Sequence, residues 1–227
     1  EGTWLAKKAE LSGNLTAISV KAGPTATGQM TVKVDQLATA ATVQSAEAIG
    51  VDPAKPLKDQ ITGFAATEFY VNGTKIEVSE NDALNDIIAK INRSTNVSAY
   101  YDKNSGKLAF ASKQTGLVND PDNPDSGGGQ YITFSHSAGG TYVTSDFVTN
   151  VLKITNADDT RTAAQNAELT VTINGLTTNQ TSTSNTLTIN GVELALKEAG
   201  GAETIINVST DVDAIVEKVK SFIADYN

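Results

Sequence analysis

Several residue types are scarce in this sequence or missing from it. Cysteine is absent from the 227 residues, histidine occurs once, and aromatic residues make up 6%. Without cysteine there are no disulfides, thiol nucleophiles or thiolate metal sites, so stability must come from packing. No window approaches the roughly 18 consecutive apolar residues of a membrane-spanning helix. Lys and Arg number 17 against 26 Asp and Glu, and the net charge of −9 repels a phosphate backbone. We expect neither a membrane nor a nucleic-acid partner.

The scarcity of histidine also limits catalysis. The single histidine, His136, lies between Ser135 and Ser137 beside a predicted strand. Neighbouring residues of a strand point to opposite faces, which argues against a serine–histidine relay with either serine, so we expect a structural His136 and not a catalytic one. No convergent pair of carboxylates stands out either. The sequence therefore predicts no catalytic residue, no cofactor and no enzymatic activity.

One acidic stretch resembles a cation-binding loop in composition. Asp120, Asp122 and Asp125 precede a run of glycines that ends at Gly129. Calcium takes several oxygen ligands, but Pro124 stands where a ligand would be wanted and no Glu closes the loop. The glycines also lack the Lys and Ser or Thr of a phosphate-binding loop. We expect an exposed, solvated loop at 120–129 without a metal ion.

Strand patterns dominate the chain. Gln29–Gln36 alternates apolar and polar residues, which is typical of a strand with one buried face. Asn-Gly pairs, which favour the positive φ angles of tight hairpins, occur three times, and we expect at least two to be hairpin turns. The pairs begin at Asn72, Asn174 and Asn190. Further strands are predicted at 69–71, 76–78, 97–101, 107–111, 131–134, 169–173, 187–189, 192–196 and 205–208.

Two segments have helical periodicity. Apolar residues at Leu84, Ile87, Ile88 and Ile91 predict a short amphipathic helix, with Ser79 and Asp82 spaced as a capping box. The final segment steps by four and three residues, which is the seam of a heptad repeat, and Thr210 and Asp213 can cap its start. The seam consists of Val212, Val216, Val219, Ile223 and Tyr226.

The seam residues need a partner surface, and they are our candidate interface residues. We expect intramolecular packing for this stretch and self-association in a continuation of the helix. The pattern still runs at Asn227 and the chain opens on Glu1 without an initiator Met, so we expect an excised segment of a longer protein.

Four stretches resemble the bacterial flagellar hook-associated cap protein family (FliD). Residues 29–40 resemble the family's strand ending in Gln-Leu-Ala, and 69–116 resembles a repeat shared by flagellins and hook-associated proteins. Residues 164–186, with Ala-Gln-Asn-Ala, Val-Thr-Ile-Asn-Gly and Ser-Asn-Thr, resemble the entry to the family's hairpin domain, and 208–227 resembles the start of its leg helix.

The resemblance implies a mainly β fold with short helices (α+β), in which one strand-rich head domain is inserted in another. We place the first head domain at 1–48 and 162–210, the inserted one at 49–161 with the repeat at 67–116, and the leg helix from 211 to 227.

The resemblance also implies a function. It predicts a secreted, structural protein of the bacterial flagellum that serves motility. Such a protein is exported by the flagellar type III system, forms a homo-oligomeric ring at the filament tip, promotes folding and polymerisation of flagellin, and prevents leakage of flagellin monomers. The alternative is a surface adhesin that binds host glycans or mucin, because Thr-rich strand domains without cysteine are common on bacterial surfaces.

Overall fold

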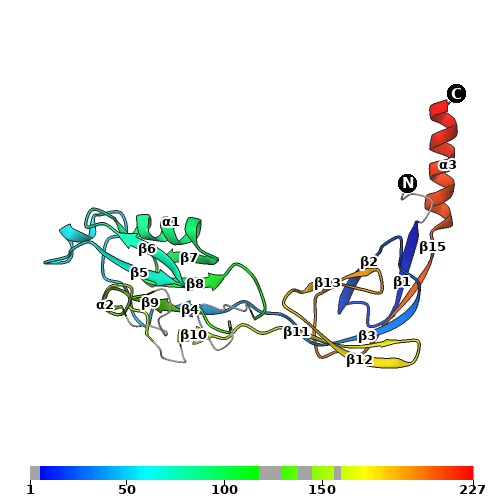
Figure 1. Cartoon of the computed structure of the whole chain (residues 1–227), viewed down its shortest axis with the longest axis horizontal. Helices are drawn as coiled ribbons and strands as arrows, with labels where there is room; N and C mark the ends of the chain where they lie inside the picture. Colours follow the sequence, from blue (N-terminus) through cyan, green and yellow to red (C-terminus); the bar gives the residue numbers. More distant parts are fainter. Residues whose placement is uncertain (1–5, 118–128, 138–144, 156–159, 227) are drawn as a thin grey trace. The chain divides into compact units, whose positions relative to one another are not determined.

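The computed structural model describes residues 6–117, 129–137, 145–155 and 160–226 (Figure 1). The chain forms two compact units, with 39–165 inserted between the two segments of the other, 1–38 and 166–227. We call the discontinuous part unit 1 and the insert unit 2. All strand pairs among the described residues are antiparallel.

Unit 1 is a sandwich of two sheets followed by a helix. The larger sheet has the order β1-β15-β3-β11-β12 and the smaller one β13-β14-β2. Side chains from both sheets, among them Val32, Leu169 and Leu194, form one core. The elements are β1 (Lys7–Gly13), β2 (Ile18–Ala22), β3 (Gly28–Gln36), β11 (Ala167–Ile173), β12 (Leu176–Ser182), β13 (Thr186–Ile189), β14 (Val192–Leu196), β15 (Thr204–Thr210) and α3 (Val212–Tyr226).

Unit 2 combines two small sheets with short helices. Its sheets have the orders β10-β4-β8-β7 and β6-β5-β9. Helix α1 lies against β6 and β7, as Figure 1 shows, and Phe110 and Phe134 meet edge to face at 5.1 Å in the core. The elements are β4 (Thr42–Gln44), η2 (Leu57–Asp59, a 3-10 turn), β5 (Thr67–Val71), β6 (Thr74–Val78), α1 (Leu84–Ser94), β7 (Val97–Asp102), β8 (Lys107–Ser112), β9 (Phe134–Ser135), α2 (Asp146–Asn150) and β10 (Arg161–Thr162).

The predicted hairpins are confirmed. Asn72, Asn174 and Asn190 have φ of 46°, 51° and 49°, each is followed by a glycine with positive φ, and they join β5 to β6, β11 to β12 and β13 to β14. An Asn-Gly pair adopts two successive positive φ angles at low cost, and such a turn matches the twist of the flanking strands. The mainly β fold with short helices is confirmed as well.

The expected caps of both helices were wrong. Helix α1 begins at Leu84, and the Asp86 carboxylate accepts the N–H of Ala83 at 2.9 Å. Ser79 and Asp82 instead form a turn before the helix, in which the Ser79 N–H donates to the Asp82 carboxylate at 2.7 Å. At α3, Asp211 accepts the N–H of Ala214 at 2.9 Å, so Asp211 is the cap and not Thr210.

The expected domain boundaries also need correction. We placed residues 39–48 in the first domain, but β4 pairs with β8 and β10 and therefore belongs to unit 2. We expected the first domain to resume at residue 162. Strand β10 includes Thr162 and pairs with β4 of unit 2, and unit 1 resumes only at Asn166. Thr39 and Gln165 form a bridge at the end of unit 2, where each N–H donates to the other's carbonyl.

Candidate functional site

The seam of α3 is an exposed apolar stripe. Val212, Val216 and Ile223 are 61%, 43% and 52% exposed, whereas Val219 is half-buried. The side chain of Tyr226, the last candidate, lies outside the described part of the molecule. The described residues do not cover Val212, Val216 and Ile223, so the expected intramolecular packing is not seen within them and stays a prediction. Their role as interface residues stays a prediction.

Sequence reasoning missed one residue of this stripe. Phe222 is 67% exposed and lies three residues after Val219 and directly before Ile223. The heptad spacing selects one residue at each step of four or three, so it selected Ile223 and passed over the adjacent Phe222. The apolar stripe of a helix is usually wider than one residue per turn. A large exposed aromatic residue is the signal that could have found it.

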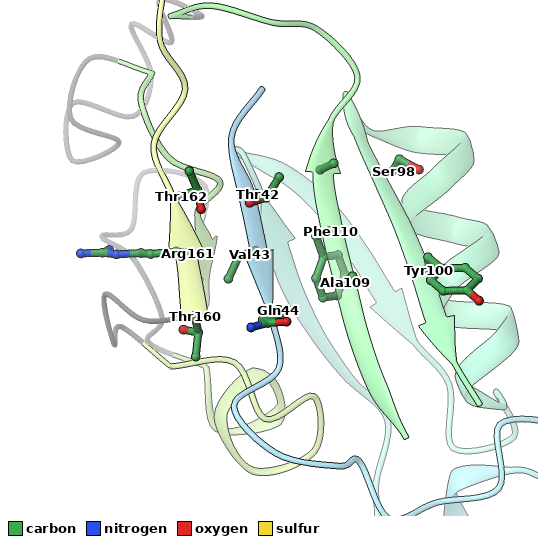
Figure 2. Close-up of a pocket in the computed structure, with 11 residues that line it drawn as sticks. Thr42, Val43, Gln44, Ser98, Tyr100, Ala109, Phe110, Thr160, Arg161 and Thr162 are labelled. Carbon is green, nitrogen blue, oxygen red and sulfur yellow. The ribbon is translucent and has the colours of Figure 1, made fainter. Parts of the chain in front are cut away.

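The second candidate surface is the open face of the sheet β10-β4-β8-β7 (Figure 2). Val43, Ala99 and Phe110 are buried in the core of unit 2, so their neighbours along each strand face outward. This face borders a shallow hollow of about 410 Å³. Most residues that line the hollow have small, uncharged side chains. Tyr100 has the largest side chain among them and is 63% exposed. Hydroxyl, amide and aromatic groups of this kind can make contacts, but they contain no acid–base pair.

Arg161 is the one charged residue that lines this hollow. Its side chain points away from the other labelled residues in Figure 2, and its guanidinium carbon lies 4.5 Å from the centroid of the Tyr131 ring. This is cation–π geometry, which fixes β10 against the segment around Tyr131. The guanidinium therefore serves packing within unit 2.

The residues that could suggest catalysis or metal binding do not converge. His136 is exposed while Ser135 is buried, as expected for neighbours at a strand. The described residues contain no cluster of three or more His, Asp or Glu that could hold a metal ion. Asp120, Asp122 and Asp125 lie outside them, so the loop prediction at 120–129 stays a prediction. No helix in the described part of the chain is long and apolar enough to span a membrane.

Asparagine residues of the family-like motifs pair with backbone. Asn92 on α1 accepts the N–H of Ala99 at 2.7 Å and donates to its carbonyl at 2.9 Å. Asn185 does the same to Ala38, at 2.8 and 2.9 Å. Each side chain thus satisfies both polar groups of one buried residue, as a neighbouring strand would. Asn185 thereby joins two segments that are 147 residues apart, whereas Asn92 joins α1 to the strand that follows it, seven residues further along the chain.

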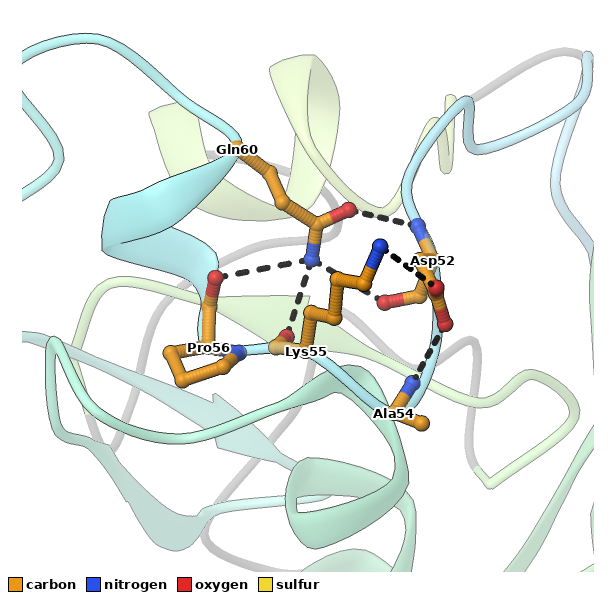
Figure 3. A network of polar contacts seen from close by, with 5 residues as sticks. All are labelled: Asp52, Ala54, Lys55, Pro56 and Gln60. Carbon is orange, nitrogen blue, oxygen red and sulfur yellow. Dashed lines mark hydrogen bonds and ion pairs between the residues drawn. The ribbon is translucent and has the colours of Figure 1, made fainter.

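A polar network fixes the loop before η2 (Figure 3). The Gln60 side chain accepts the N–H of Asp52 at 2.6 Å and donates to the carbonyls of Asp52 at 3.0 Å and Lys55 at 2.9 Å. The N–H of Ala54 and then the Lys55 ammonium, 3.4 Å away, lower the pKa of the Asp52 carboxyl. The Gln60 side chain therefore holds the loop in place by hydrogen bonds to the backbone of Asp52 and Lys55.

In the repeat-like hairpin, polar groups shape the turn between β7 and β8. The Ser105 hydroxyl donates to the Asp102 carboxylate at 2.7 Å and its N–H donates at 3.0 Å. These bonds lower the pKa of Asp102, because they favour the charged carboxylate. Gly106 closes the turn with φ of 69°.

Comparison with known families decides the identity. Residues 164–227 match the model of the flagellar hook-associated protein 2 C-terminus, and residues 62–114 match the flagellin hook IN motif. A flagellar hook-associated protein 2 from Thermotoga maritima is 30% identical over 189 residues. The chain belongs to the flagellar hook-associated protein 2 family. The first match spans the return to unit 1 and α3, and the second spans α1 and the hairpins around it.

Solved structures of flagellar hook-associated protein 2 (FliD) share the fold. The D1–D2–D3 domains of the flagellar cap protein FliD from Escherichia coli align with all of this chain and 63% of that one, at 20% identity and a TM-score of 0.70. FliD from Pseudomonas aeruginosa aligns over 93% of both chains, at 23% identity and a TM-score of 0.60. The T. maritima match covers 81% of this chain and 28% of the relative, so the chain spans about 28% of that protein's length.

Proposed function

We propose that this chain is the head segment of a filament cap protein, with the beginning of a helical leg. In this proposal the whole protein is exported, oligomerises as a ring at the filament tip, and covers the space in which flagellin subunits fold and insert. The family match, which includes both unit 1 and unit 2, is the observation that carries the proposal. The function consists of binding and assembly, and no covalent bond is broken.

The mechanism assigns different roles to sheets and helix. The strand-rich units, each with its own buried core, act as a rigid lid. Helix α3 begins directly after β15 and exposes its apolar stripe, which suits packing against another helix. In this proposal Val212, Val216, Val219, Ile223 and Tyr226 form that interface. Burial of a valine or isoleucine stabilises such a contact by about 1.5–3 kcal/mol per side chain.

Deletion of the parent gene in its source bacterium tests the cap function. We expect flagellin to leak into the medium, filaments to be short or missing, and the full-length protein to restore them. Normal filaments after deletion would overturn the proposal. Purified full-length protein that stays monomeric and does not bind filament ends would overturn it as well.

A pair of variants tests the helix interface in the full-length protein. Val216→Asp places a charge in the apolar stripe, while Lys218→Asp changes an exposed residue two positions further along the helix. We expect Val216→Asp to reduce assembly at least tenfold, measured by sedimentation velocity, and Lys218→Asp to have little effect. Both should leave the melting of units 1 and 2 unchanged, because both positions are exposed. Equal assembly of the two variants would contradict the interface.

A further inference from the structure

Strand β12 is an unprotected sheet edge. It ends the five-stranded sheet, pairs with β11 on one side, and forms the lower border of unit 1 in Figure 1. Its residues Leu176–Thr181 are exposed on both faces. The seven-residue strand contains neither a charged residue nor proline. A strand edge with unpaired N–H and C=O groups is a template for another strand.

The opposite edge of the same sheet is protected. Strand β1 carries Lys7, Lys8 and Glu10, and Lys8 and Glu10 form an ion pair at 3.0 Å. Charged side chains on an edge discourage the approach of a second strand. One sheet therefore has a charged edge and a neutral edge.

The long edges of unit 2 are protected in other ways. On β7, Asn92 occupies both outward backbone groups of Ala99. On β6, Lys75 and Glu77 are charged, and Lys90 donates to the Glu77 carbonyl at 2.9 Å. The remaining edge strands β9 and β10 have two residues each. In unit 1, the edge strand β2 carries Lys21, and the edge strand β13 is uncharged but has only four residues. Among the described edge strands of five or more residues, β12 is the one with neither a charged residue nor a side chain bonded to its outward backbone groups.

The turn at Asn174-Gly175 determines which backbone groups of β12 point outward. In a hairpin with a two-residue loop, the flanking residues Ile173 and Leu176 form a hydrogen-bonded pair, and such pairs then alternate along the strands. The N–H and C=O groups of every second residue consequently point away from β11. These residues are Thr177, Asn179 and Thr181.

The outward residues have the palindromic order Thr-Asn-Thr. If two copies of this strand pair antiparallel around Asn179, each Asn179 lies opposite the other, and Thr177 lies opposite Thr181 of the second copy. The three outward pairs then exchange about six backbone hydrogen bonds. A two-fold interface requires a self-complementary patch, and this edge provides one.

We propose that β12 pairs with β12 of a second copy of this chain, antiparallel and with the two-fold axis at Asn179. Charge favours this occupant: the chain carries a net charge of −9, and β12 is an edge at which two copies can approach without charges directly opposed. The cross-strand Thr pairs add side-chain hydrogen bonding. The interface is small, which places the pair among the weak ones.

The pair is independent of the proposed ring. A ring joins two different surfaces of neighbouring copies, whereas a two-fold contact joins the same surface of two copies. Variants of β12 should change pairing without changing the α3 stripe. Failure of the β12 contact would leave the cap proposal standing, and the reverse also holds.

Engineered cysteines test the register, since the chain contains no cysteine of its own. Asn179→Cys places two thiols on the two-fold axis, where the paired Cα atoms lie about 5.5 Å apart, within disulfide range. Thr181→Cys is the matched control: it lies on the same exposed edge, but its copy is four residues away along the partner strand, about 14 Å. With oxidised glutathione, Asn179→Cys should form the disulfide dimer at least tenfold faster. Equal rates for the two variants would overturn the proposal.

Sedimentation equilibrium of the 227-residue chain tests the pair without a cross-link. We expect concentration-dependent dimerisation, with Kd raised at least tenfold by Asn179→Lys, which sets like charges opposite each other. Ser12→Lys makes the same change on the opposite, charged edge and should leave Kd unchanged. A wild-type chain that is monomeric at about 1 mM would overturn the proposal. So would a monomeric chain whose β12 binds an extended segment of a different protein.

Discussion

Replacement of Asn185 by alanine should destabilise unit 1. The Asn185 side chain accepts the N–H of Ala38 at 2.8 Å and donates to its carbonyl at 2.9 Å, and Ala38 is only 4% exposed. Alanine removes both bonds and leaves two backbone groups without their partners. A net hydrogen bond contributes about 0.5–1.5 kcal/mol, and a buried unsatisfied group costs about 1–3 kcal/mol. We expect the free energy of unfolding to fall by about 2–3 kcal/mol.

The assay must follow unit 1 separately, because two units need not unfold together. Native-state hydrogen exchange of the core amides of Val32 and Val171 reports on unit 1, and exchange at Phe69 reports on unit 2. We expect faster exchange at Val32 and Val171 and no change at Phe69. Asn179→Ala is the control, because it removes an exposed asparagine from β12 in the same unit and should stay within about 0.5 kcal/mol of wild type.

Asn185→Asp separates the two bonds of this clamp. It keeps the size and the acceptor, but it loses the donor and places a carboxylate oxygen beside the Ala38 carbonyl. At pH 7 it should therefore destabilise unit 1 at least as much as alanine does. If Asn185→Ala lies within about 0.5 kcal/mol of wild type, the pairing of this side chain with backbone is not a stabilising contact and the reasoning is refuted.

Two further predictions concern a turn and a carboxylate. Gly191→Ala should cost at least about 1 kcal/mol more than Gly175→Ala in urea denaturation. Both glycines have positive φ, but a Cβ at Gly191 would lie 2.8 Å from the Ala26 nitrogen while one at Gly175 meets nothing within 4 Å. Equal costs would contradict this. The Lys33 ammonium and then the Thr170 hydroxyl lower the pKa of Asp35, so its contribution to stability is present above the unfolded pKa of about 4 and is lost as the pH falls through the lower folded value. Asp35→Asn should reduce the loss of stability below about pH 4 in acid titrations, and an unchanged acid limb would argue against the Lys33 contact.

Local patterns were sufficient for many elements. Strand β3 follows from the alternation of Met30, Val32 and Val34, and the Asn-Gly hairpins follow from a turn chemistry that depends on two adjacent residues. Helix α1 follows from its apolar spacing. Each of these signals lies within one or two turns of the chain, so it can be detected without knowledge of the fold.

Other elements depend on distant partners. Strand β1 pairs with β15, some two hundred residues away in the chain, and the mixed sequence of β1 has no clear alternation. Strand β12 is exposed on both faces, so no buried side chain marks it. The short β4 belongs to unit 2 because it pairs with β8 and β10, and its three residues carry no local signal of that pairing. Caps also escaped prediction, because several neighbouring Asp, Ser and Thr residues could each have served.

The candidate surfaces divide in the same way. The sequence by itself determined that α3 carries an apolar seam, because heptad spacing is a property of the chain. It also determined that disulfides and thiol chemistry are excluded, because the chain contains no cysteine. Only the tertiary structure decided that Val212, Val216 and Ile223 are exposed and that β12 is a free edge. Exposure depends on which other segments pack nearby, and that is fixed by long-range pairing and not by local pattern.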